Sequence, residues 1–242
     1  MANLGKRIVF SIVSHGQRAL VDKLLISLDN NLVVGDFDII LVITQNIDEP
    51  NCDFISSLYP VKVIENLRPR GFGSNHNHVF EMFSSDYIFI LNPDIEFNKP
   101  FCLARFVDSM VSKNLKLCSP KIMSPDLVTE DFLRVIPTPV SLIKRRLKFN
   151  GDVEHFDWIA GMFLVVESSV FRNVGGFDEG YFMYVEDCDL SIRVNNEFSI
   201  GVLSTFSVIH DARRGSLKSW RHFFWHVKSL LLLYCKLLCR RL

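Results

Sequence analysis

The sequence predicts an α/β fold, with a mixed, mostly parallel sheet flanked by helices and a helical extension at the C-terminus. Three observations support this class. Short β-branched runs alternate with segments of helical periodicity, the pattern of a layered α/β domain. The runs are apolar almost throughout, as in parallel strands that helices cover on both faces. From residue 216 onward the chain becomes basic, apolar and helix-like.

Strands and helices are predicted in alternation along the first half of the chain. The run from Arg7 to Val13 is almost entirely β-branched or apolar, and leucines at helical spacing follow it. The predicted strands are Arg7 to Val13, Asp38 to Thr44, Pro60 to Ile64 and Tyr87 to Leu91. The predicted helices are Gln17 to Asn30, Gly73 to Phe83 and Phe101 to Lys113.

The second half of the chain is less regular. Ser119 to Asn150 contains four prolines and a basic run at 144–148, so we expect it to be irregular. Later predicted elements are a strand at Phe163 to Val166, a helix at Ser168 to Asn173 closed by Gly175-Gly176, and short strands at Ile200 to Leu203 and Ser207 to Ile209. We expect 1–215 to form one domain and 216–242 a separate helical segment.

Composition excludes several classes of protein. With 242 residues, 48% of them hydrophobic and 22% charged, the chain can bury a sizeable core. The formal net charge is zero, so nothing indicates a nucleic-acid partner. The six cysteines form no CxxC pair, and the N-terminus is more typical of a buried strand than of an export signal. We therefore expect a reducing, cytoplasmic setting. No GxSxG elbow occurs, which disfavours Ser-His-Asp hydrolysis.

The segment 216–242 carries apolar and basic side chains but no acidic one. Its longest uninterrupted apolar run, Leu230 to Cys235, is far shorter than the roughly 20 residues that span a bilayer. A basic helix containing Trp220 and Trp225 is typical of a membrane interface. A helix packed on the domain or on a partner subunit accounts for the same pattern. Both interpretations stay open.

Asn92-Pro93-Asp94 follows the predicted strand YIFIL. In open α/β sheets, ligands bind beyond the carboxyl ends of the strands, where Asp94 is expected to lie. A carboxylate there can hold Mg²⁺ or Mn²⁺ against a diphosphate, and the cation neutralises charge on a departing nucleoside diphosphate. The alternative is a turn after a strand, for which Asn, Pro and Asp are equally suited.

Glu186, Asp187 and Asp189 place three carboxylates within four residues. Buried together without a cation, they would repel one another strongly. The preceding aromatic run, GYFMYV, indicates a cleft wall rather than open surface. The alternative is capping of the helix that begins near DLSIRV. Together with Asp94, these acids suit cation binding at one position and proton abstraction at another, a combination that favours sugar transfer from a nucleotide.

Two further features are candidates for the same site. The glycines in RPRGFGSNHN precede a polar helix start, where backbone amides can approach a phosphate, although neither GK[ST] nor GxGxxG is present. His210 follows a late strand and can complete a metal site, or simply end that strand. We expect His76, His78, His222 and His226 to be surface or packing residues.

In their order along the chain, these motifs resemble those of the family 2 glycosyltransferases, which have the Rossmann-like GT-A fold. The likeness is greatest to the bacterial rhamnosyltransferase-like branch, which builds surface polysaccharides, and it extends over about residues 7 to 215. The matching segments are SIVSHGQ, ENLRPRGFGSNHN, FILNPDIEF, DWIAGMFLVV and VGGFDEGYFMYVEDCDLSIRV, with the late His210. The block VGGFDEGYFMYVEDCDL is the most specific of them.

The resemblance implies a hexosyltransferase that moves a sugar, with inversion, from a dTDP- or UDP-linked donor to an acceptor hydroxyl, with Mg²⁺ or Mn²⁺ as cofactor. The implied acceptor is a growing surface polysaccharide, a lipopolysaccharide or another lipid-linked glycan. We expect the enzyme to work on the cytoplasmic side, and the basic, aromatic residues of 217–242 motivate peripheral contact with the membrane. The zero net charge indicates no nucleic-acid partner, and the sequence leaves the oligomeric state open.

The resemblance also implies roles for individual residues. Asp187 matches the base that deprotonates the acceptor, with Glu186 as its neighbour, and Asp94 and His210 match metal-binding positions. The residues that match the donor site are Ser14, His15, Gln17, Asn46, Gly71, Phe72, Gly73, Asn77, Asn92 and Asp94. Those that match the sugar and acceptor region are Asp157, Trp158, Gly161 and Asp178.

Three departures from the family pattern keep other functions open. Asn92 stands where the general motif has its first Asp, Thr44-Gln45-Asn46 lacks the usual acidic base-reading residue, and His15 replaces the more usual Tyr. A non-catalytic subunit that binds nucleotide sugars or a partner is the alternative these departures suggest. A nucleotidyltransferase would carry a basic, Gly-rich loop near the N-terminus, which SIVSHGQ matches poorly.

Overall fold

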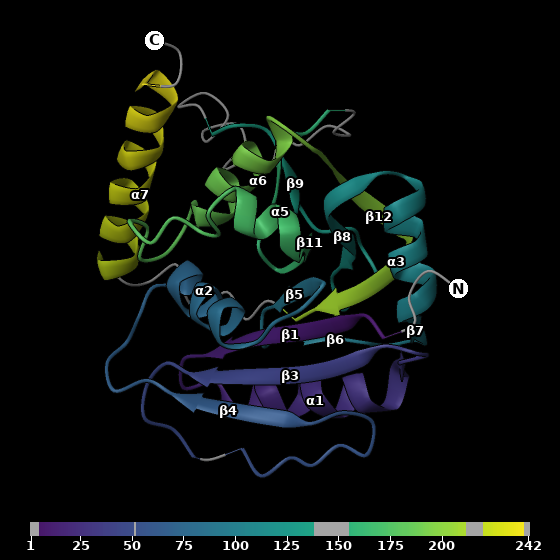
Figure 1. Cartoon of the computed structure of the whole chain (residues 1–242). Coiled ribbons are helices and arrows are strands. Elements are labelled where there is room, and N and C mark those ends of the chain that lie inside the picture. The colour runs from purple at the N-terminus through teal and green to yellow at the C-terminus, as the bar shows by residue number, and fades with distance from the viewer. Residues whose placement is uncertain (1–4, 51, 138–154, 212–219, 240–242) are drawn as a thin grey trace.

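The computed structural model describes residues 5–50, 52–137, 155–211 and 220–239 (Figure 1). The main sheet contains β1 (Arg7–Ser14), β3 (Asp38–Gln45), β4 (Val61–Glu65), β5 (Tyr87–Leu91), β6 (Ile95–Glu96), β8 (Leu115–Met123), β11 (Phe163–Glu167) and β12 (Ser199–His210). The helices are α1 (Arg18–Asn31), α2 (Phe72–Met82), α3 (Leu103–Ser112), α5 (Ser168–Asn173), α6 (Glu186–Asn195) and α7 (Trp220–Cys239). Two small sheets pair β2 (Leu32–Val33) with β7 (Phe101–Cys102) and β9 (Leu133–Arg134) with β10 (Trp158–Ile159).

The eight strands of the main sheet lie in the order β4-β3-β1-β5-β11-β8-β12-β6. β11 is antiparallel to both of its neighbours and β6 is antiparallel to β12, whereas the remaining pairs are parallel. The predicted mixed, mostly parallel sheet flanked by helices is therefore confirmed, as is the C-terminal helix.

Strand β1 shows why helices cover both faces of the sheet. Successive side chains of a strand point to opposite faces. Phe10 and Ile12 belong to the large core cluster that includes Leu24 of α1, whereas Val9 packs in a smaller cluster with Val79 of α2. α1 and α2 therefore cover opposite faces of β1. This double burial explains why the strand is apolar almost throughout.

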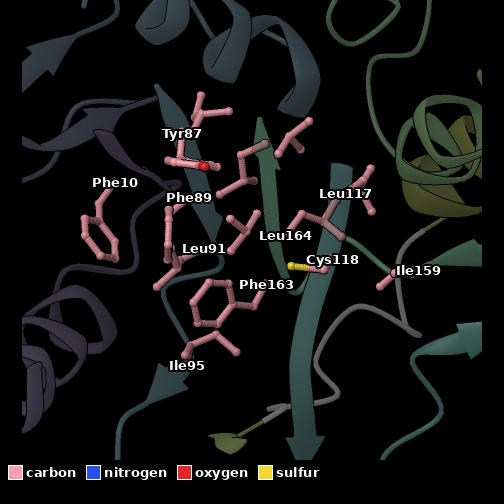
Figure 2. Packing of buried hydrophobic residues seen from close by; sticks show 14 of the residues in the cluster. Phe10, Tyr87, Phe89, Leu91, Ile95, Leu117, Cys118, Ile159, Phe163 and Leu164 are labelled. Atoms are coloured by element: carbon pink, nitrogen blue, oxygen red, sulfur yellow. The ribbon is translucent and has the colours of Figure 1, made fainter. Parts of the chain in front are cut away.

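Phenylalanine fills much of the core, which accounts for its 21 copies in the sequence. Figure 2 shows Phe89 of β5 in the middle of this cluster, with Phe10 and Phe163 nearby. The centroid of the Phe89 ring lies 4.8 Å from that of Phe10, 6.1 Å from that of Phe163 and 5.9 Å from that of Phe106. Tilted ring pairs of this kind contribute about 0.5–1.5 kcal/mol each beyond the burial of their area. The central strands are therefore held firmly against one another.

The prediction of irregular structure from Ser119 was wrong for its first residues, because β8 continues to Met123 in the middle of the sheet. Pro120 is tolerated where the ladder is interrupted on both sides. The pairing with β11 covers only Leu117 and Cys118, and β12 has a register shift after Leu203, the partner of Pro120. The rest of the predicted irregular segment includes the short strand β9, and 138–150 lies outside the described residues.

Two other predicted boundaries differ from the structure. The two late strands are one strand, β12, whose register shift falls between Leu203 and Ser207, where the sequence pattern breaks. The helix predicted from Phe101 begins at Leu103, because Phe101 and Cys102 pair with β2 instead. Both differences arise from pairing with distant segments, which local periodicity does not reveal.

Helix α7 packs on the rest of the chain near α6 (Figure 1). Leu233 is buried in the main core cluster, and the Ser229 hydroxyl donates a hydrogen bond to the Met183 carbonyl at 2.9 Å. The Tyr234 hydroxyl donates to the Pro137 carbonyl at 2.6 Å. One face of α7 is thus packed on the domain, as one of the two interpretations predicted. No helix within the described ranges has both the length and the apolar character needed to cross a membrane.

Candidate active site

The carboxyl ends of β1, β3 and β5 meet at one edge of the sheet because these strands are parallel. Ser14 pairs with Gln45, and Ile12 pairs with Leu91. β11 runs antiparallel to β5, so its first residue, Phe163, also pairs with Leu91. The segment that precedes β11 therefore lies at this edge too. A cleft of about 880 Å³ opens here, where open α/β sheets bind their ligands.

Strand β12 brings His210 to the same edge. His210 pairs with Ile95, the residue after Asp94, and the Asp211 amide donates to the Asp94 carbonyl at 3.0 Å. His210 Nε2 lies 3.3 Å from Asp94 Oδ1, and His210 Nδ1 lies 3.1 Å from Glu130 Oε2. Burial by itself lowers the pKa of His210, but the two carboxylates outweigh burial and raise that pKa above its usual range.

The residues around Asp94 fit a divalent cation. Asp94 Oδ1 is buried and accepts no hydrogen bond, and its 3.3 Å contact with His210 Nε2 is an ion pair only when that ring is protonated, so the oxygen can serve as a ligand. His210 Nε2 is the nearest basic atom. No three His, Cys, Asp or Glu side chains in the described ranges are grouped so that they could hold a metal ion by themselves. A cation here would therefore take its remaining ligands from substrate phosphates and water, as Mg²⁺ does in nucleotide sites.

Asp187 lies in the first turn of α6 and lines the cleft. Its Oδ2 accepts a hydrogen bond from the Gly161 amide at 2.7 Å, and its Oδ1 accepts one from the Cys188 amide at 2.9 Å. A Cβ on Gly161 would lie 3.2 Å from Asp187 Cβ, so the close approach favours glycine there. These bonds fix the orientation of a carboxylate that is only half-buried, as proton abstraction from a bound ligand requires.

Glu186 and Asp189 differ from Asp187 in their surroundings. Burial, reinforced by the Asp187 charge, raises the pKa of Glu186 to about 8, and its Oε2 has no hydrogen-bond partner. Asp189 is buried in an ion pair with Arg193 Nε at 2.7 Å. Capping does not explain the three acids, because Val185 occupies the N-cap position and no side chain caps the helix. Of the three, only Glu186 and Asp187 line the cleft.

Most of the predicted site residues do come together in this cleft. Those that line it are His15, Gln17, Asn46, Phe72, Asn92, Asp94, Trp158, Gly161, Glu186, Asp187 and His210. Asn46 also organises the loop beside it: its side chain donates to the Arg70 carbonyl at 2.9 Å and accepts from the Arg70 amide at 2.8 Å. These two bonds engage both the nitrogen and the oxygen of the Asn46 side-chain amide. Asn46 therefore holds the backbone of Arg70 in the cleft wall, as well as lining the cleft itself.

Four predicted donor-site residues are not among those that line the cleft. The Ser14 hydroxyl donates to Glu49 Oε2 at 2.8 Å. Asn77 is buried, and its side chain bonds to the Phe177 carbonyl at 2.8 Å and to the Phe177 amide at 2.9 Å. The two glycines allow close packing. A Cβ added to Gly71 would lie 2.8 Å from the Phe182 carbonyl oxygen, and a Cβ added to Gly73 would lie 2.5 Å from Phe177 Cβ.

Asp157 and Asp178, predicted for the sugar and acceptor region, also do not line the cleft. Asp157 Oδ2 accepts a hydrogen bond from the Ile136 amide at 2.7 Å, and this bond fixes the chain just before β10. Asp178 forms an ion pair with Lys236 of α7 and accepts from the Gly180 amide at 2.8 Å. In the structure both carboxylates hold loops in place.

Several residues that line the cleft or contact its lining were missed by the sequence predictions. Glu130 falls in a segment that we expected to be irregular. Its contact with His210 depends on β8, a strand that the sequence analysis did not predict. His222 and His226 line the cleft, although we expected surface or packing residues. His76 is a buried packing residue, as expected, with Nδ1 2.7 Å from the Ser11 hydroxyl. The remaining missed residues with polar or aromatic side chains are Arg70, Arg134, Phe182, Tyr184 and Trp225.

Comparison with known proteins shows the family to which this chain belongs. A family model described as glycosyl transferase family 2 matches residues 21–171. The chain is 30% identical over 238 residues to rhamnosyltransferase WbbL of Escherichia coli (strain K12), a match that covers 90% of this chain and 89% of that protein. It is 27% identical over 169 residues to the N-acetylglucosaminyl-diphospho-decaprenol L-rhamnosyltransferase of Mycobacterium tuberculosis (strain ATCC 25618 / H37Rv), covering 62% of this chain and 55% of that protein.

A solved structure shows the same fold. A mannosyltransferase from Pyrobaculum calidifontis, in complex with GDP-Man and Mn²⁺, has a TM-score of 0.58 at 11% identity over 87% of this chain and 59% of its own. The fold, the family and the activity predicted from the motifs are thus confirmed, and nothing in the matches favours a non-catalytic subunit. The chain belongs to glycosyl transferase family 2, as a GT-A glycosyltransferase of the bacterial rhamnosyltransferase-like branch.

Proposed function

We propose that this enzyme transfers rhamnose, with inversion, from a dTDP- or UDP-linked donor to a hydroxyl of a lipid-linked or lipopolysaccharide acceptor. One observation carries the proposal: Asp187 and the pair formed by Asp94 and His210 line the same cleft. The names of two relatives, a rhamnosyltransferase and a rhamnosyltransferase acting on a decaprenol-linked sugar, support the choice of sugar and acceptor.

In the proposed reaction, the Asp187 carboxylate takes the proton of the acceptor hydroxyl. The acceptor oxygen then forms a bond to the anomeric carbon of the donor sugar. The bond from that carbon to the diphosphate breaks, and the nucleoside diphosphate leaves with the electron pair. Attack in line with the leaving group inverts the anomeric centre and requires base and diphosphate on opposite sides of the sugar.

The environment of Asp187 suits a base. The Gly161 and Cys188 amides hold its two oxygens, so little reorganisation is needed when a hydroxyl approaches. Because burial raises the pKa of Glu186 to about 8, that neighbour carries a proton at neutral pH. The first turn of α6 then bears one less negative charge beside the base. The positive end of the helix stabilises the charge that remains on Asp187.

We also propose that Asp94 and His210 hold Mg²⁺ or Mn²⁺, with Glu130 fixing the imidazole ring of His210 through Nδ1. The cation, when bound, neutralises charge on the leaving diphosphate. The support is the buried Asp94 Oδ1 without a hydrogen bond and the position of His210 between two carboxylates. A carboxylate behind a metal-bound histidine orients the ring and fixes its tautomer.

The Asp187→Asn substitution tests the base. It keeps the size of the side chain but removes the proton acceptor, so transfer should fall by about 10² to 10⁴-fold while nucleotide affinity stays the same. Turnover of radiolabelled donor and calorimetric titration with the nucleotide measure the two effects. The exposed Asp126→Asn variant is the matched control and should behave as wild type. Near-normal turnover by Asp187→Asn would reject this role.

The Asp94→Ala substitution tests the cation site. It removes the proposed ligand, so Mn²⁺ should no longer strengthen nucleotide binding, a loss of more than about tenfold in affinity. Calorimetry with dTDP and UDP, with and without Mn²⁺, gives the measurement. Wild type treated with EDTA should match the variant, and Glu130→Gln should show a smaller loss. If the native protein binds nucleotide and transfers sugar equally well without a divalent cation, the site is wrongly assigned.

We further propose that the outer face of α7 rests on an anionic membrane surface. This face carries exposed apolar side chains at helical spacing, including Trp220 at 78% and Phe224 at 66% exposure. The others are Phe223, Val227, Leu231 and Leu238. The segment 216–242 contains six basic residues and no acidic one, so its charge complements anionic lipid headgroups.

Vesicle sedimentation tests the membrane contact. The double variant Phe223→Ser, Phe224→Ser should lose most of the binding to vesicles that contain phosphatidylglycerol, because two large apolar side chains no longer enter the interface. Ile55→Ser is the control, since Ile55 is exposed but lies far from α7 in the sequence. Equal sedimentation of all three proteins would contradict the proposal. The proposal would also be contradicted if the wild type formed a dimer and the double variant did not, because this face would then bind a second copy of the chain.

A further inference from the structure

Helix α7 contacts each residue of the loop that leads into the base. This loop, Tyr181 to Tyr184, ends just before Glu186 and Asp187. Lys236 lies over the Tyr181 ring at 4.5 Å, Trp225 packs on Phe182 at 4.8 Å, the Ser229 hydroxyl donates to the Met183 carbonyl at 2.9 Å, and the Tyr184 hydroxyl is 2.7 Å from His222 Nδ1. The C-terminal helix therefore fixes the wall of the cleft beside the base.

The backbone at the end of this loop is strained. Tyr184 and Val185 have φ values of 71° and 72°, in the left-handed region that β-branched and bulky residues rarely adopt. Such conformations persist where the surrounding structure over-determines them, and they cluster at ligand sites. The bond between Tyr184 and His222, and the edge-on contact of Tyr184 with the His226 ring at 5.2 Å, hold Tyr184 in this conformation.

The inner face of α7 also lines the cleft itself. His222, Trp225 and His226 belong to its lining, together with Tyr184 and Asp187. The indole of Trp225 stands edge-on to the His222 ring, with 5.0 Å between their centroids. One face of the helix thus presents two imidazoles and an indole to the ligand space next to the base, while the opposite face is the exposed apolar one.

The chemistry of this cluster suits a sugar ring. Indole and phenol rings cover the apolar face of a pyranose, and imidazole nitrogens and a phenol hydroxyl exchange hydrogen bonds with its hydroxyl groups. The donor diphosphate belongs near Asp94, in the part of the cleft proposed for the cation. The base must touch the acceptor hydroxyl, so side chains adjacent to Asp187 contact the acceptor rather than the diphosphate.

We propose that the inner face of α7, together with Tyr184, is the subsite for the acceptor sugar. This inference rests on the proposed function. Its ligand class is a neutral pyranose of a lipid-linked glycan. Because the outer face of the same helix rests on the membrane in that proposal, the sugar bound here lies within about 10–12 Å, one helix diameter, of the lipid surface. The subsite therefore takes a sugar close to its lipid anchor.

Kinetics with a defined acceptor test the subsite. The probes are N-acetylglucosaminyl-diphospho-decaprenol in detergent micelles and dTDP-rhamnose. The variants are His226→Ala and Tyr184→Phe, the second of which removes only a hydroxyl. We expect the KM for the acceptor to rise by about tenfold, the effect of losing one or two hydrogen bonds, while the KM for the donor changes by less than about twofold.

Ile55→Ser is the control, because Ile55 is exposed, is not part of α7 and does not line the cleft. It should leave the KM for the acceptor unchanged. A purely structural role for α7 would instead raise both KM values and lower the melting temperature. An unchanged acceptor KM in both variants would overturn the subsite, and so would a wild-type enzyme that hydrolyses the donor but does not use or bind this acceptor. A wild-type protein without any donor turnover would instead refute the proposed function itself.

Discussion

The hydrogen bond from the Gly161 amide to Asp187 Oδ2, at 2.7 Å, joins the helix that carries the proposed base to the edge of the sheet. Gly161 lies just before β11, which pairs with β5, and the Asn92 amide donates to the Met162 carbonyl at 2.9 Å. Asn92 is two residues before Asp94. The two carboxylates that are distant in sequence are thus connected through a short series of backbone contacts. The spacing between the proposed base and the proposed cation site is therefore set by the short turns that adjoin the paired ends of β5 and β11.

Much of the sheet could be predicted from sequence because its strands are buried on both faces. Such strands are continuous apolar runs, as in β1 and β5, and the carboxyl ends of parallel strands meet at one edge whatever the details of the loops. That rule alone brings Asp94 to the cleft. The aromatic run before Glu186 and Asp187 likewise indicated a cleft wall, because bulky side chains next to acids are rarely left on open surface.

The remaining features depend on contacts between segments far apart in the sequence. Asn77 and Asp157 are polar residues within family motifs, but their partners include backbone groups of Phe177 and Ile136, which no local pattern identifies. The positions of the α7 histidines in the cleft follow only once that helix is packed against the loop before Asp187. The apolar and basic composition of α7 left packing on the domain and contact with a membrane open; the structure confirms the packing, and the membrane contact stays a proposal.

The central claim is that the sugar lies between the cation site and the base. The most direct test is a crystal structure of the Asp187→Asn variant with Mn²⁺ and an intact dTDP- or UDP-sugar, using the anomalous signal of manganese. We expect the manganese peak bound to Asp94 and His210 Nε2 and to the diphosphate, with the anomeric carbon between that peak and residue 187. A manganese peak elsewhere in the molecule, or a sugar turned so that the diphosphate separates it from residue 187, would contradict the account.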